Sequence, residues 1–333
     1  MDFRVTEDQE ALREGLRTFC DGRVPVETLR ELEQKPELDR ALWGELAEMG
    51  IFALRLPEDE GGVGLGMSDA AIAFIELGRR LVPGPLVWSH LAAGLVDGAA
   101  TGLTVVGGLD LISHPDAPYI IEHLESLDVV LLLQPDGIYR VDPDVLSAKP
   151  IATPLDPLTP VHHVASLLDG QRIGGADDAA KLHLEGATLT AALMLGIAEA
   201  SQELATEYAK SREQFGRPIA GFQTIKHILA DMFVRQEVAR AAVYAAGATL
   251  DDPEVGDGVR AVSAAKATAG EGAMRNSRDC IQVHGGMGYT WEVPAHYYLK
   301  RTWVLETVFG GVEEHAERVA RRVEGDLRAL GRF

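Results

Sequence analysis

Hydrophobic side chains near the start of the chain recur at the spacing of an amphipathic helix. They stand three and four positions apart, at Leu12, Leu16 and Phe19. Just before them, Thr6 and Gln9 fit a capping box, in which each side chain accepts a hydrogen bond from a free backbone amide at the helix start. The pattern predicts that the first helix begins after Thr6.

Two further helices are predicted in the same region. One covers 40–49 and ends at Gly50, a residue suited to a left-handed C-terminal cap. The other covers 68–81, and Ser68 is the residue expected to cap it. We therefore predict a helical domain over 1–98.

Short runs rich in β-branched side chains replace the helical pattern over 99–182. Three of these runs are predicted to be strands, namely 103–106, 129–133 and 138–141. Pro135-Asp136-Gly137 predicts a hairpin turn between the last two, because proline presets one turn angle and glycine accepts the unusual one. The prolines that follow, from Pro143 to Pro160, favour loops or edge strands. This segment is predicted to be a shortened β domain.

Long alanine-rich helices are predicted in the last part of the chain, 183–333. The segments 222–250 and 259–281 are long enough for bundle helices, and Gly221 and Pro253 stand at their boundaries. The order helix, strand, helix predicts a mainly α fold with a β domain inserted before a C-terminal helical bundle.

The composition narrows the class of protein. The 333 residues carry 31 Lys and Arg against 51 Asp and Glu, a net charge of −20 that argues against nucleic acid or anionic lipid as the main partner. No apolar run reaches the roughly 18 residues of a membrane span, and the first residues lack the features of a signal peptide. Two cysteines, Cys20 and Cys280, are too few for a disulfide framework. We expect a soluble, cytoplasmic protein.

The first candidate for chemistry is the segment 211–218, where a long helix is predicted to break. Its sequence is Ser-Arg-Glu-Gln-Phe-Gly-Arg-Pro, so Arg212 and Arg217 are basic points in an acidic chain. A guanidinium group matches a phosphate with two parallel hydrogen bonds. The alternative is a helix end that carries cations near its negative dipole.

The second candidate is the segment 282–289, Gln-Val-His-Gly-Gly-Met-Gly-Tyr, which follows another long helix. Closely spaced glycines let backbone amides approach a ligand without a Cβ atom in the way. The alternative is a helix stop followed by a tight turn.

Together the two segments resemble the acyl-CoA dehydrogenase family. Arg212-Glu213-Gln214-Phe215-Gly216, then Phe222-Gln223, then the segment 282–288 are similar to the C-terminal motifs with which that family contacts FAD. The segments 43–50, 57–64 and 76–78 are similar to its N-terminal helical domain, and 291–309 to the region after the glycine motif. The resemblance covers nearly the whole chain and implies an N-terminal helical domain, a middle β domain and a C-terminal four-helix bundle.

In that family FAD lies across a subunit interface, and the motifs of one subunit hold the adenosine diphosphate end of a flavin whose ring lies in its neighbour. The resemblance therefore implies a set of FAD-contacting residues in this chain. They are Arg212, Gln214, Phe215, Gln223, Gln282, Val283, His284, Gly285 and Gly286.

The chain departs from the family at the catalytic base. Members use a glutamate to take the α-proton of an acyl-CoA, and aligning from Arg301 puts that position on Gly310, with Val312 in place of a threonine that touches flavin. A minority of members place the base at the position of Gly186 here. Since glycine cannot accept a proton, both usual positions are empty. The β domain is also short, and it lacks the family's stretch that lines the flavin ring.

One arrangement known in the family reconciles these features. Some actinobacterial members are α2β2 heterotetramers of two paralogous subunits, only one of which carries the base. The resemblance thus implies a larger paralogous partner, an acyl-CoA substrate that includes the CoA esters of steroid side chains, and an electron-transferring flavoprotein as electron acceptor.

Two alternatives remain open. The chain would be a self-sufficient homo-oligomeric dehydrogenase if a displaced carboxylate replaced the base, and Glu306, Glu185 and Glu313 lie near the empty positions. It would be a flavin-free structural subunit if its motifs were degenerate. A base must come within about 3 Å of its proton, which the sequence does not show.

The remaining residues of interest favour simple structural roles. His162-His163 has no cysteine or further histidine at ligand spacing, so we expect no metal site. The aromatic residues between Trp291 and Trp303 are expected to pack in the core or at an interface, with substrate stacking as the alternative. Cys280 has no nearby base and is expected to be buried and unreactive.

Overall fold

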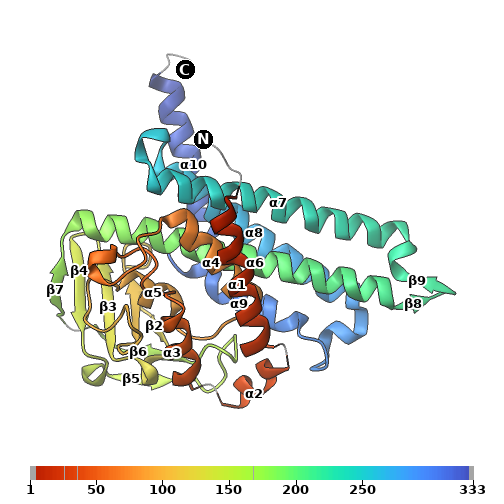
Figure 1. Cartoon of the computed structure of the whole chain (residues 1–333), viewed down its shortest axis with the longest axis horizontal. Coiled ribbons are helices and arrows are strands. Elements are labelled where there is room, and N and C mark those ends of the chain that lie inside the picture. Colours follow the sequence, from red (N-terminus) through yellow and green to blue (C-terminus); the bar gives the residue numbers. More distant parts are fainter. Residues whose placement is uncertain (1–4, 26, 36, 168, 330–333) are drawn as a thin grey trace.

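The computed structural model describes residues 5–25, 27–35, 37–167 and 169–329 (Figure 1). Helices form one layer along the length of the molecule, and the β region packs at one end of it. The N-terminal helices are α1 (Glu7–Arg23), α2 (Thr28–Gln34), α3 (Arg40–Glu48), α4 (Met67–Arg79) and α5 (Leu86–Leu91). The mainly α fold with a small β region is confirmed.

The caps of two N-terminal helices contrast. The capping box of α1 is present: Thr6 Oγ1 accepts from the Gln9 amide at 3.2 Å, and Gln9 Oε1 accepts from the Thr6 amide at 3.1 Å. The expected cap at Ser68 is wrong, because α4 begins one residue earlier and its N-cap is Gly66. Asp69 accepts from the Gly66 amide, while the Ser68 hydroxyl donates at 2.7 Å to Asp251, the last residue of α7 (Gln223–Asp251).

The β region holds two small sheets among the described residues. The first has the order β1–β3–β4–β7 and the second the order β2–β6–β5. The strands are β1 (Val106–Asp110), β2 (Tyr119–Glu122), β3 (Val129–Gln134), β4 (Gly137–Val141), β5 (Ala148–Pro150), β6 (Val161–Val164) and β7 (Gln171–Gly174). Strands β1 and β3 are parallel, and the other pairs in these two sheets are antiparallel.

Most of the strand predictions hold, with one shift. The hairpin of β3 and β4 is confirmed, with Gln134 paired to Gly137 across the turn. The first predicted strand, 103–106, is wrong in position, because β1 begins only at Val106 and runs through Gly107 and Gly108. Those glycines fit there because a Cβ atom on Gly108 would lie 2.6 Å from the Trp88 ring. The pairing with the apolar strand β3 therefore outweighs the low strand propensity of glycine.

The C-terminal helices form the long bundle. They are α6 (Ala176–Ser211), α7 (Gln223–Asp251), α8 (Gly258–His284), α9 (Ala295–Thr307) and α10 (Val312–Ala329). Helix α6 packs against α4, α7 and α8, so it joins the N-terminal domain to the bundle. Both predicted long helices are present, at α7 and α8. The division of the chain at 98 and 182 stays a prediction, and α6 begins at Ala176.

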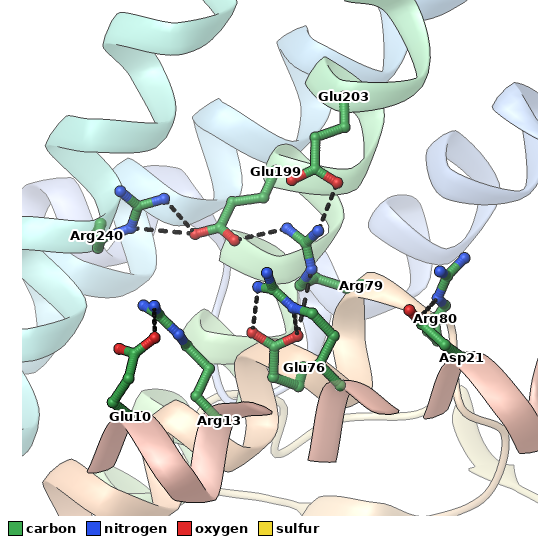
Figure 2. Close-up of polar contacts among 10 residues, drawn as sticks. Glu10, Arg13, Asp21, Glu76, Arg79, Arg80, Glu199, Glu203 and Arg240 are labelled. Atoms are coloured by element: carbon green, nitrogen blue, oxygen red, sulfur yellow. Dashed lines mark hydrogen bonds and ion pairs between the residues drawn. The ribbon is translucent and has the colours of Figure 1, made fainter. Parts of the chain in front are cut away.

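A network of ion pairs fixes α4 to the bundle (Figure 2). Arg79 of α4 lies 2.9 Å from Glu199 of α6 and 3.3 Å from Glu76, and it also pairs with Glu203. Arg240 of α7 contacts the other oxygen of Glu199 at 2.8 Å. Burial alone would lower the pKa of Arg79, but these carboxylates raise it, Glu203 most of all. The guanidinium group therefore stays charged at the junction of three helices.

Candidate functional site

The segment 211–218 forms a small hairpin that projects from the end of the bundle (Figure 1). Helix α6 ends at Ser211, and strands β8 (Glu213–Gln214) and β9 (Arg217–Pro218) pair antiparallel. The two turn residues, Phe215 and Gly216, have φ angles of 53° and 76°, as a type I′ hairpin requires. The Phe215 side chain is 92% exposed. A phenylalanine in a left-handed conformation with an exposed ring is unusual for a residue with a structural role alone.

Two arginines flank this turn. Arg217 stacks on the Phe222 ring, with its guanidinium carbon 4.2 Å from the ring centroid. Arg212 is exposed and makes no ion pair within the part of the chain that the structure describes. Gln223, also exposed, contacts His227 at 3.1 Å. The hairpin thus presents a guanidinium group and an aromatic ring to its surroundings.

The glycine segment follows the end of α8. Gly285 has a φ angle of 58°, and a Cβ atom on Gly285 or Gly286 would meet no other atom of the chain within 4 Å. Gln282 is exposed beside them. The side chains of Val283 and His284 are buried instead, and the His284 ring stacks on Tyr208 of α6 at 4.2 Å. Val283 and His284 can therefore face a ligand only through their backbone.

The hairpin and the glycine segment lie at the same end of the bundle. A separate hydrophobic cluster joins them, since it contains Ala205 and Ala209 of α6, Met232 of α7 and Cys280 of α8. We call the exposed residues of both segments the clasp: Arg212, Gln214, Phe215, Gln223, Gln282, Gly285 and Gly286. A phosphate-bearing ligand would find a free guanidinium group and open backbone there.

A second feature, at the other end of the molecule, is a cavity of about 530 Å³ between the β region and α9. It is bounded by β1, by β2, by the loop 151–161 and by the C-terminal end of α9. Apolar side chains dominate its wall, and they include the aromatic residues Trp88, Tyr119, Trp303 and Phe309. A cavity of this size and character is typical of a small-molecule site.

The loop between α9 and α10 closes one side of this cavity, and buried polar groups hold it. The Lys266 ammonium group donates to three backbone carbonyls, those of Leu305 at 3.1 Å, Glu306 at 3.0 Å and Gly310 at 2.9 Å. His315 Nε2 lies 2.8 Å from the Phe309 carbonyl. Burial lowers the pKa of Lys266 to about 7 and that of His315 to about 4. The loop is therefore held in one conformation from both sides.

Comparisons with known proteins decide the family. A model described as acyl-CoA dehydrogenase, N-terminal domain, matches residues 6–100, and one described as acyl-CoA dehydrogenase, C-terminal domain, matches residues 174–324. Acyl-CoA dehydrogenase IpdE2 of Mycolicibacterium smegmatis is 30% identical over 334 residues, which cover 96% of this chain and 100% of the relative. The chain belongs to the acyl-CoA dehydrogenase family. FAD is the cofactor of this family.

Other relatives and solved structures agree with this assignment. Acyl-CoA dehydrogenase FadE34 of Mycobacterium tuberculosis is 32% identical and matches 97% of this chain, which spans 49% of FadE34. The ChsE4-ChsE5 complex of the same organism has a TM-score of 0.83 at 23% identity, covering 97% of this chain and 99% of the other. The Tcur3481-Tcur3483 steroid ACAD has a TM-score of 0.82 at 23% identity, covering 98% and 99%. At these identities the structures establish the fold.

The clasp fits the diphosphate end of FAD. Arg212 makes no ion pair with a carboxylate of the described residues, and Gly285 and Gly286 leave open the space that side chains would fill. These residues would bind the cofactor through a guanidinium group and backbone amides, and the exposed Phe215 ring would cover an apolar part of it.

The two positions at which the resemblance places the base, Gly186 and Gly310, are blocked in this chain. A Cβ atom on Gly186 would lie 2.4 Å from the tip of the Phe309 ring, which packs against Trp88 at 4.8 Å. Gly310 has a φ angle of 93°, and a Cβ atom there would lie 2.9 Å from His315. Neither position accommodates a longer side chain without rearrangement.

Of the three displaced carboxylates considered from the sequence, two have other partners and the third is exposed. Glu306 Oε1 accepts from the Val312 amide at 3.1 Å and so caps α10. Glu185 pairs with Arg55 at 2.5 Å. Glu313 is exposed on the first turn of α10. The side chains that line the cavity include none of these three.

The structure brings a different carboxylate to the cavity, that of Glu122 at the end of β2. Sequence reasoning missed it, although one signal was available. Tyr119-Ile120-Ile121-Glu122 is an apolar run whose last member is acidic, and alternation along a strand puts Glu122 on the same face as Ile120.

The other expected groups have structural partners. His162 pairs with Glu125 at 3.1 Å, and no group of metal-ligating side chains occurs among the described residues. Cys280 is fully buried, and burial raises the pKa of its thiol to about 12. Of the aromatic cluster, Tyr297 is buried, whereas Trp303 lines the cavity. The described helices include none long and apolar enough to span a membrane.

Proposed function

We propose that this chain is a subunit of a cytoplasmic, FAD-dependent acyl-CoA dehydrogenase. Its clasp binds the adenosine diphosphate end of a flavin whose ring lies in a larger paralogous partner, and the partner carries the catalytic base. FAD, when bound, accepts the β-hydride of an acyl-CoA thioester whose α-proton goes to a carboxylate. In this chain Arg212 binds the diphosphate, and the Gly285 and Gly286 amides approach it.

One observation carries this proposal. The clasp and the cavity lie at opposite ends of the folded molecule, because the hairpin lies at the far end of the bundle from the β region (Figure 1). The clasp therefore serves a molecule held mainly by another subunit. The exposed Phe215 ring and the unpaired Arg212 fit such an intermolecular site.

The relatives support the heteromeric form and the substrate class. ChsE4-ChsE5 is a complex, and the Tcur3481-Tcur3483 protein is a steroid ACAD. The blocked base positions at Gly186 and Gly310 agree with a chain that leaves proton abstraction to its partner. We extend the proposal to CoA thioesters of steroid side chains as substrates and to an electron-transferring flavoprotein as the electron acceptor.

The test is a visible spectrum of the chain purified alone and of the chain co-purified with a larger paralogue. Oxidised flavin absorbs at about 370 and 450 nm. We expect a colourless chain and a yellow complex. Arg212→Ala should weaken flavin retention roughly 10- to 100-fold, the cost of one charged hydrogen-bonding group, whereas Arg321→Ala on the exposed face of α10 should not change it.

Two outcomes would overturn the proposal. A chain that is yellow alone and bleaches with an acyl-CoA would be the self-sufficient enzyme. A complex that keeps its flavin after Arg212→Ala would make this chain a flavin-free structural subunit.

A further inference from the structure

The cavity beside α9 is separate from the clasp and has an open, apolar mouth. Ile120, Ile151 and Leu155 line it and are exposed at its rim. Trp88 and Trp303 lie on its wall. The proposed function assigns no ligand to this cavity, since the flavin ring would lie in the partner.

Four acidic or histidine side chains line the cavity, and three of them have partners. Asp110 accepts from the Ile112 amide at 3.0 Å and lies 3.3 Å from His183. His114 Nε2 donates to the Thr307 carbonyl at 2.8 Å. Asp156 pairs with Arg301 at 2.5 Å and accepts from the Thr159 hydroxyl. The side chain of the fourth, Glu122, makes no hydrogen bond with any residue that the structure describes.

The backbone holds Glu122 in place. It pairs with Val161 of β6, and it lies on the cavity face of β2 with Ile120, whereas Ile121 between them is fully buried on the other face. A carboxyl group that is fixed in this way inside an apolar wall and left without a partner costs free energy, which a bound hydrogen-bonding group would offset.

The surroundings of Glu122 select the chemistry of that group. Arg301 lies beside it, since both line a recess of about 40 Å³ next to the cavity, and Arg301 Nη2 is buried without a hydrogen bond. Burial raises the pKa of Glu122 to about 7, against the opposing effect of Arg301. Both the neutral and the ionised carboxyl are therefore populated near neutral pH.

A hydroxyl group suits both forms, because it donates to a carboxylate and accepts from a neutral carboxyl. A hydroxyl group can also donate to Glu122 and accept from the unpaired Arg301 Nη2 of the adjoining recess, whereas an ammonium ligand can only donate and a carboxylate ligand can only accept. We propose that this cavity binds a compact, mostly apolar molecule with one hydroxyl group, and that Glu122 is its hydrogen-bonding anchor.

The test compares three probes with one apolar skeleton, 1-adamantanol, 1-adamantanecarboxylic acid and 1-adamantanamine, by calorimetry on the full-length chain. We expect the alcohol to bind most tightly. Glu122→Leu should weaken its binding about fivefold, the equivalent of one net hydrogen bond. Glu122→Gln keeps both donor and acceptor and should retain most of the affinity. Glu125→Leu is the matched control, because that glutamate is exposed and pairs with His162 outside the cavity.

Three results would overturn this proposal: no binding of any probe, tightest binding of the acid or the amine, or an unchanged affinity for the alcohol in Glu122→Leu. The ranking of probes on the unmodified chain needs no variant to fold. Since the experiment contains neither flavin nor a partner subunit, its failure and the failure of the proposed function are independent.

Discussion

At the scale of single residues, Phe309 occupies the space that a side chain at Gly186 would need. Its φ angle of 56° turns the ring toward α6, where it lies over the backbone of Gly186 and against Trp88. Phe309 is completely buried, and its ring also borders the cavity. The space beside Gly186 is thus filled by packed aromatic side chains.

This packing predicts a coupling between Gly186 and Phe309. Gly186→Ala should destabilise the fold by about 1–3 kcal/mol, because the added methyl group overlaps the ring. In a Phe309→Ala background the same change should be neutral or stabilising, since alanine is preferred to glycine in a helix by about 1 kcal/mol. Urea unfolding of the four proteins measures the coupling. Gly15→Ala in α1 is the control and should stabilise the fold, because nothing lies within 4 Å of the added methyl group. Equal effects of Gly186→Ala in the wild-type and Phe309→Ala backgrounds would contradict the overlap.

Lys266 predicts a pH dependence of stability. Burial lowers its pKa to about 7 in the folded chain, whereas an unfolded lysine titrates near about 10.4. Between these values the unfolded chain binds more protons, so this residue makes the free energy of unfolding rise with pH, by at most about 1.4 kcal/mol per pH unit. The difference in stability between the wild type and Lys266→Met, measured by urea unfolding at pH 6, 8 and 9.5, should therefore grow in favour of the wild type. Parallel pH curves would contradict this account.

At the scale of elements, Glu306 in the last turn of α9 links this helix to α10. Glu306 accepts from the Val312 amide and so caps α10. This contact gives Glu306 a structural role in the connection between the two helices.

Glu306→Gln keeps an acceptor oxygen, so the free energy of unfolding should change by less than about 0.5 kcal/mol, while Glu306→Ala should cost about 1 kcal/mol. Neither change should reduce the dehydrogenase activity of the complex by more than the loss of folded protein explains. Steady-state rates with an acyl-CoA check this. A rate that falls a thousandfold in Glu306→Gln would identify Glu306 as the base instead.

The helices and strands also show which structural features can be predicted from sequence patterns alone. Thr6 and Gln9 specify the start of α1 because their partners lie within one turn. Ser68 is an equally favourable N-cap residue type, yet its hydroxyl donates a hydrogen bond to Asp251, a residue 183 positions away. The FAD motifs were visible because they are contiguous, whereas Glu122 becomes a candidate only when α9 closes the cavity over β2. Local signals predict elements, and long-range packing decides which side chains remain free.

At the scale of the whole molecule, the ion-pair network of Figure 2 joins the N-terminal domain to the bundle. Its central side chains are buried, with Arg79, Glu76 and Glu199 all at most 11% exposed. Removing one member of such a network leaves charges without partners in a poorly solvated place. Removing one member of an exposed pair at the edge of the same network leaves its partner solvated and costs little stability.

Neighbouring arginines provide the test. Arg79→Ala should lower the free energy of unfolding by about 3 kcal/mol, because it leaves buried Glu76 and Glu199 with fewer partners. Arg80→Ala removes only the pair with Asp21 and should cost less than about 1 kcal/mol. Chemical denaturation of both variants makes the comparison, and similar losses would show that the network contributes no more than a surface pair.

The contact between Phe309 and Gly186 also bears on how the family can change. A glutamate introduced at Gly186 would collide with Phe309, and one introduced at Gly310 would meet His315 in a backbone conformation that favours glycine. Regaining a base at either place therefore takes at least two coordinated substitutions, the first of which is harmful alone. The two glycines are therefore easier to keep than to replace by a glutamate.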